Sequence, residues 1–189
     1  EFDFRHEIEY GVTDRLQAAI YVADWKVSEE RPIYKATAFE LIYNMTNPVT
    51  DLLGSALYGE VKLGDQQFKL EGKILLQKNF GPIVMAYNAG IEAEWEGERF
   101  GHYEERSGEF MESFGVSYQV SPRFLLGGEF LHEVGFDEWQ EAGDPVIYAG
   151  PNASFRFDRF FVTTTAMVQV TAVKDEPDFQ LRTIFGMHF

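Results

Sequence analysis

The sequence predicts an all-β fold, an antiparallel up-and-down β-barrel, and three observations support that fold class. Apolar and polar residues alternate with a period of two in segments of about ten residues, and helical periodicity is nearly absent. Aromatic residues make up 16% of the 189 residues, an excess that needs a large surface or core to occupy. No run approaches the roughly 18–20 consecutive apolar residues of a membrane helix. The length suits one domain over residues 1–189.

The first segment, residues 2–10, shows the alternation that defines each predicted strand. Phe2, Phe4 and Ile8 lie on one face, and charged side chains occupy the other. Ten further segments repeat this pattern, so we expect about eleven strands. In order along the chain, these segments span residues 16–22, 36–44, 53–63, 68–77, 85–95, 110–120, 124–132, 149–157, 162–171 and 179–189.

The predicted connections between strands alternate in length. Short turns are expected at residues 12–15, 47–51, 79–82, 121–123 and 158–159. Longer, polar and mostly acidic loops are expected at residues 24–32, 96–108, 137–144 and 174–178. Short turns at one end and long loops at the other are typical of transmembrane barrels of the bacterial outer membrane, whose short turns face the periplasm. We therefore expect a transmembrane barrel.

The last segment carries a pattern of its own. It alternates up to a carboxy-terminal Phe, with Phe185, Met187 and Phe189 on one face. This pattern resembles the assembly signal of bacterial outer-membrane barrels, and residues 9–16 and 150–157 resemble stretches of uncharacterised porin-like or transporter-like barrel families. The resemblance implies a place in the bacterial outer membrane, contact with its lipid and lipopolysaccharide, and the barrel-assembly machinery as a partner.

The expected strand count is odd. Counting back from a periplasmic carboxy terminus gives eleven strands and leaves residue 1 on the outer side, whereas bacterial single-chain barrels have an even number of strands. We expect an upstream strand, outside this sequence, to complete a barrel of twelve. Two alternatives remain: a misread strand, which would give ten, or a strand supplied by another protein chain at the amino-terminal edge. The loops offer a second surface for such a partner.

Charged side chains recur on the face opposite the apolar one, and in a barrel this face lines the lumen. The fourteen expected lumen-lining charges are Arg5, Glu7, Glu9, Glu40, Glu60, Lys62, Lys69, Glu71, Lys73, Glu92, Glu94, Glu129, Arg156 and Arg182. They fit two interpretations equally well. The first is a small porin-like channel or transporter with a polar, slightly cation-favouring lumen, because rings of charge set pore selectivity.

The second interpretation is a barrel plugged by salt bridges, with a structural or partner-binding role in an outer-membrane complex. In that case Lys69, Glu71 and Lys73 of one strand would pair with the preceding strand. Their partners there would be Glu60 and Lys62.

A lipid hydrolase is the third hypothesis, and it depends on His132. A tight hairpin centred on Pro122 sets Glu112 opposite His132, with both side chains outward near the upper rim. No nucleophile completes the set, because Ser113 falls on the inward face and Ser107 lies in the predicted loop. We expect a polar pair at headgroup level rather than an enzyme.

Composition and motifs exclude further classes. The net charge of −15 argues against nucleic acid as a partner, since phosphate binding needs clustered cations. The absence of Cys excludes disulfides, thiolate nucleophiles and Cys-ligated metals. The four His are scattered without a His-Glu-x-x-His motif, the acidic loops lack EF-hand spacing, and no phosphate-cradling loop is present. We expect neither a metal nor a cofactor.

Overall fold

The structure is a computed structural model that describes residues 2–28, 31–174 and 176–189. The described residues form strands, turns and loops. No helix among them is long and apolar enough to span a membrane. The strands are β1 (Phe2–Gly11), β2 (Leu16–Ser28), β3 (Arg31–Thr46), β4 (Gly54–Gly64), β5 (Gln67–Phe80), β6 (Ile83–Arg99), β7 (His102–Ser121), β8 (Phe124–Asp137), β9 (Glu141–Ala142), β10 (Val146–Arg156), β11 (Phe160–Gln169) and β12 (Phe179–Met187).

Each of the eleven predicted segments forms a long strand, so the alternative count of ten is wrong. The period-two pattern finds them because every strand has one apolar and one polar face. The twelfth element, β9, is only two residues long and pairs with β8. β9 lies in the connection between β8 and β10 and is not one of the long strands of the sheet.

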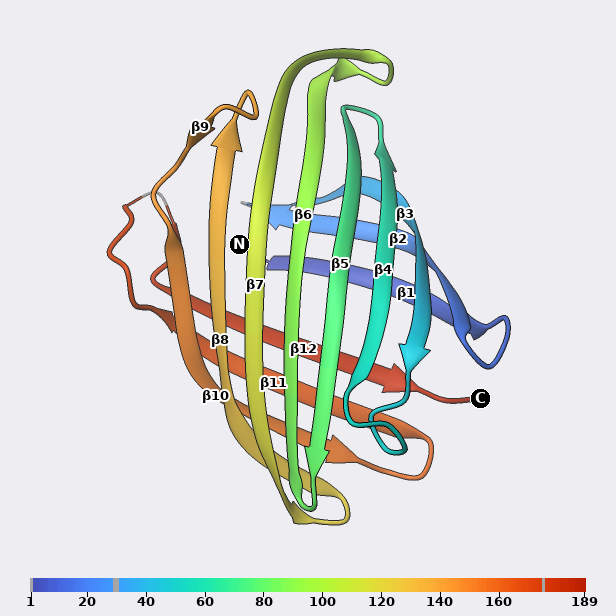
Figure 1. The fold of residues 1–189 in the computed structure, drawn as a ribbon. Coiled ribbons are helices and arrows are strands. Elements are labelled where there is room, and N and C mark those ends of the chain that lie inside the picture. Colours follow the sequence, from blue (N-terminus) through green and yellow to red (C-terminus); the bar gives the residue numbers. More distant parts are fainter. Residues whose placement is uncertain (1, 29–30, 175) are drawn as a thin grey trace.

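The long strands form a single sheet that curls on itself (Figure 1). Their order is β1-β2-β3-β4-β5-β6-β7-β8-β10-β11-β12, and each neighbouring pair is antiparallel. Figure 1 shows β1, β2 and the carboxy-terminal strands passing behind β4 to β7, which gives a half-barrel. No ladder joins β1 to β12 in the part of the chain that the structure describes. Because an even number of antiparallel steps separates these two edge strands, they run in the same direction.

The predicted loop at residues 96–108 is wrong, because β6 and β7 continue through most of it. Arg99 pairs with His102, and only Phe100 and Gly101 form the turn. Charged side chains occupy both faces of this hairpin, so the hydrophobic alternation disappears although the strands continue. Gly97 allows a bulge there, since a Cβ would lie 1.9 Å from the carbonyl oxygen of His102.

The other connections also differ from the predicted pattern. β2 and β3 cover most of the predicted loop at residues 24–32, and residues 29–30 lie outside the described residues. β8 continues to Asp137, and the loop before β12 begins directly after Gln169. The short turns lie where they are predicted, except that the turn from residue 47 extends to residue 53. The expected sorting of short turns and long loops therefore holds only in part.

The curvature separates a convex from a concave face. Side chains that bond across intervening strands can meet only on the concave side, as Arg5 of β1 does with Glu60 of β4 across β2 and β3. The convex face leaves large apolar side chains exposed along every long strand, among them Phe39, Ile91 and Leu181. A folded water-soluble protein rarely exposes so large an apolar surface.

The buried apolar core is small and lies at one place on the concave face. Tyr148 and Met167 are fully buried, and Leu131 and Val146 pack around them. Val173, from the loop before β12, covers this cluster. The core thus ties β8, β10 and β11 to the last long connection.

Candidate functional site

The strand register places all fourteen predicted lumen-lining charges on the concave face. The arrangement depends on the pleat, because residues two apart on a strand share a face and opposed residues in the ladder do too. Most of these side chains meet partners there. Arg156 lies at the end of β10 opposite Phe161, away from the main cluster.

A row of glutamates crosses this face, one from each of five consecutive strands. It comprises Glu40, Glu60, Glu71, Glu92 and Glu109, each directly opposite the next in the ladder. Like charges in directly opposed positions destabilise a sheet, so the row carries a cost in stability. Glu109 is not among the predicted lumen-lining charges, because it lies between the predicted loop at residues 96–108 and the strand predicted from residue 110. Adding the registers of successive hairpins would have revealed the row.

Cations and hydroxyls from neighbouring positions offset the first part of this row. Arg5 donates to Glu60 at 2.9 Å, and Tyr58 donates to the same carboxylate at 2.9 Å. Tyr21 donates to Glu40 at 2.9 Å. Glu60 and Glu40 are both buried, so these contacts replace the water that the carboxylates lose.

Asp24 joins the cluster, although the sequence places it at the start of a loop. It is buried, contacts the ammonium of Lys62, and lies 3.8 Å from Arg5 Nε. Simple alternation from Tyr21 would turn Asp24 outward. The register of β2 against β3 shifts between Tyr21 and Asp24, and this irregularity reverses its face.

The salt-bridge partners differ from those expected for a plugged barrel. Lys69 bonds Glu92 and Glu94 of β6, each at 2.8 Å, rather than the preceding strand. Lys73 pairs with Glu71 of its own strand at 2.5 Å. The predicted pairs with β4 fail because the register sets like against like: Glu60 faces Glu71, and Lys62 faces Lys69.

A further group binds β8 to the end of the sheet. The guanidinium of Arg182 contacts the carboxylate of Glu129, and Thr165 donates to the same group at 2.9 Å. These residues come from β8, β11 and β12, so the contacts span the curled end of the sheet. Within the described residues, no group of three or more His, Asp or Glu side chains is arranged to hold a metal ion.

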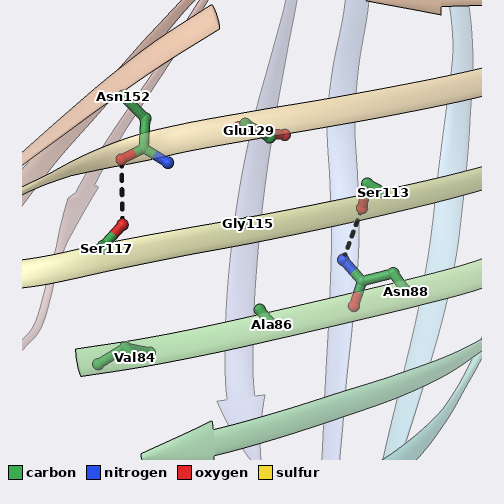
Figure 2. Close-up of a pocket in the computed structure, with 8 residues that line it drawn as sticks. All are labelled: Val84, Ala86, Asn88, Ser113, Gly115, Ser117, Glu129 and Asn152. Carbon is green, nitrogen blue, oxygen red and sulfur yellow. Dashed lines mark hydrogen bonds between the residues drawn. The ribbon is translucent and has the colours of Figure 1, made fainter. Parts of the chain in front are cut away.

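Toward the ends of the strands that meet at the short turns, the concave face carries few charged side chains and is hollow (Figure 2). A cavity of about 220 Å³ is lined by Val84, Ala86, Asn88, Ser113, Gly115, Ser117, Glu129 and Asn152. Asn88 donates to Ser113 at 3.1 Å, and Ser117 donates to Asn152 at 3.0 Å. No sequence pattern predicts this cavity, because isolated small polar residues on a strand are common.

A group of polar side chains lies on the largely apolar convex face. As predicted, Glu112 stands opposite His132, and its carboxylate lies 3.2 Å from His132 Nδ1. Tyr87 donates to the other oxygen of Glu112. Ser113 is on the opposite face as expected, whereas Ser107 lies in β7 and not in a loop.

The group of Tyr87, Glu112 and His132 orients an imidazole but supplies no nucleophile to it. Among the described residues, neither predicted serine lies on its face. Glu112 and His132 form a polar pair, and the hydroxyl of Tyr87 bonds the carboxylate of Glu112.

The predicted assembly-signal residues are exposed. Phe185 and Met187 lie on the convex face, opposite Val162 and Phe160 of β11. Phe189 follows the end of β12 with 98% of its surface exposed. The last strand thus presents an apolar row to the surroundings of the sheet.

The comparisons with known proteins identify one family. No curated protein matches the chain. A family model matches residues 1–180, which is most of the sequence, and its description is a family of unknown function, DUF6662. The chain therefore belongs to DUF6662, a family of unknown function.

Proposed function

We propose that the chain is an integral β-barrel of the bacterial outer membrane and that its concave face lines a narrow, porin-like passage that favours cations. The glutamate row carries the proposal. Five carboxylates in directly opposed positions weaken a sheet, and rings of carboxylates are what cation-selective pores use. A surface that serves only stability would alternate the two signs of charge.

The convex face supports the membrane part of the proposal. Apolar side chains stand exposed there on every long strand, and the carboxy-terminal row of Phe185 and Met187 continues the pattern. Lipid-facing residues of an outer-membrane barrel alternate with polar inward ones in the same way. Lipid and lipopolysaccharide are therefore the proposed surroundings, and the barrel-assembly machinery is the proposed partner for insertion.

Closure is the remaining requirement of a barrel in lipid, because unpaired strand edges there cost several kcal/mol for each unsatisfied group. β1 and β12 run in the same direction, and in the described part of the chain the outer edge of each is unpaired. A single antiparallel strand between them would satisfy both edges and give the even count of twelve. We propose such a strand, from an upstream segment or from another chain.

The test of the passage is conductance across a planar bilayer in a gradient of potassium chloride. We expect channel events with a reversal potential that shows preference for the cation. Glu109→Gln removes one carboxylate of the row and should reduce that preference. The matched control is Glu112→Gln on the same strand, which faces outward and should leave the reversal potential unchanged. Equal effects of both variants would contradict the assignment of faces.

Membrane insertion has its own test in Ile74→Arg. Ile74 is in the middle of β5 on the convex face, opposite Leu57 and Ala89. An arginine facing lipid near the midplane is expected to cost about 2–4 kcal/mol of unfolding free energy, measured by urea titration of protein folded in lipid vesicles. Gln77→Arg on the concave face of the same strand serves as control and should cost much less. Equal losses would argue against a lipid-facing convex side.

A structural barrel without a passage is the second candidate, and the ion pairs favour it. Arg5, Lys62 and Arg182 reach across neighbouring strands to buried or half-buried carboxylates, so they fill part of the concave side. If well-folded protein shows no ion conductance in the planar bilayer, the result would favour this structural role over the passage. Such a barrel would hold a partner by its edge or loops.

A further inference from the structure

The concave face divides into two zones of different chemistry. The glutamate row and its cations occupy one zone, and the cavity of Figure 2 lies in the other. A second cavity, of about 290 Å³, adjoins it, since Ala86 and Asn88 line both. The two together form one trough, hereafter the neutral trough. Each is smaller than the roughly 300–1,000 Å³ of small-molecule sites, but the combined trough falls within that range.

The neutral trough carries almost no charge. Glu129 is the single ionisable side chain among the described residues that line the two cavities. Its carboxylate already contacts Arg182 and accepts from Thr165. A charged solute would find only this already paired carboxylate there, so the trough offers ions less stabilisation than the glutamate row does.

Hydrogen-bonding capacity is left over on two amides that face the trough. Asn88 uses its amide nitrogen on Ser113, which leaves its carbonyl oxygen as an acceptor. Asn152 uses its carbonyl oxygen on Ser117, which leaves two N–H donors. The serines hold both amides in place. Gly115 and Ala86, which line the cavity between them, are small residues that leave the space open.

We propose that the neutral trough binds an uncharged, hydroxyl-rich solute of the size of a mono- or disaccharide. A sugar hydroxyl both donates and accepts, so it can satisfy the free oxygen of Asn88 and the free N–H groups of Asn152. The trough lacks an aromatic platform among its lining residues, which makes the binding weak, with a Kd on the order of millimolar. Weak binding suits a passage, because a solute must also leave. The proposal rests on the passage proposed above, and it names the class of solute that passes.

The test is a titration of the folded protein in detergent micelles with maltose, followed by the NMR signals of the asparagine side-chain amides. We expect saturable shifts of the Asn88 and Asn152 signals. The side-chain amide of Gln140 appears in the same spectrum and belongs to the turn between β8 and β9, outside the trough, so its signal should not move. Amides that stay unmoved at the highest soluble sugar concentration, or that move equally with sodium acetate, would overturn the proposal.

Substitutions of the two asparagines test whether the sugar binds in the trough. Asn88→Leu and Asn152→Leu should each raise the apparent Kd for maltose about tenfold, because each leaves a solute hydroxyl unpaired. Gln140→Leu should leave it unchanged. Circular dichroism shows which variants fold, and the titration of the unaltered protein decides the matter if one does not. Equal Kd values for all three variants would overturn the assignment to the trough.

The binding site and the passage can fail separately. Saturable shifts in a protein that conducts no ions would support the sugar site and overturn the passage. Cation conductance together with unmoved amides would overturn the sugar site alone.

Discussion

Truncation of Tyr148 to alanine is expected to lower the free energy of unfolding by about 3–5 kcal/mol, the loss typical of a fully buried aromatic side chain. Tyr148 and Met167 are the two large side chains with no exposed surface among the described residues. Their contacts hold β8, β10 and β11 together and anchor Val173 of the following loop. Urea unfolding followed by tryptophan fluorescence, in detergent or vesicles, measures the change.

Tyr148→Phe is the matched control for this substitution. It keeps the ring and its packing, so the loss should stay below about 1 kcal/mol. If the alanine variant unfolds at the same urea concentration as the unaltered protein, the cluster is not a core that supports the sheet.

Lys62→Met should lower the unfolding free energy by about 3–5 kcal/mol, because it leaves the buried carboxylate of Asp24 without its nearest cation. The exposed fractions of the two side chains are 5% for Asp24 and 13% for Lys62. The remaining cation, Arg5, has its Nε 3.8 Å away and already bonds Glu60. The same urea titration measures the loss.

An exposed ion pair provides the control for Lys62→Met. Arg123 lies 3.6 Å from Asp158, with side chains 68% and 92% exposed. Arg123→Met should cost less than about 1 kcal/mol, since water and salt screen such a pair. The double variant Asp24→Asn and Lys62→Met removes both charges and should recover much of the loss. A loss from Lys62→Met no greater than that from Arg123→Met would count against a buried network.

Alternation alone predicted the strands and their inward faces, because a pleated strand between two different surroundings must be amphipathic. The tight turn expected at Pro122 fixes the register of its hairpin, and this predicted that Glu112 lies opposite His132. The alternation rule failed at residues 96–108, where both faces of the hairpin are polar and no hydrophobic period exists.

The contacts between side chains could not be predicted from the sequence. Asp24 turns inward through an irregular register, which no periodic pattern reveals. Arg5 meets Glu60 three strands away only because the sheet curls, and curvature is a property of the whole sheet. The side chains of Asn88 and Asn152 likewise line one hollow only because four strands bring them together.

The parallel direction of β1 and β12 restricts how two copies of the chain could combine. Copies inserted the same way round in a membrane would bring β12 of one beside β1 of the next, and those edges could pair only as parallel strands. An antiparallel junction of identical edges would require one copy to be inverted across the membrane. If both copies insert in the same direction, a large barrel built from two such half-barrels cannot have antiparallel strands throughout.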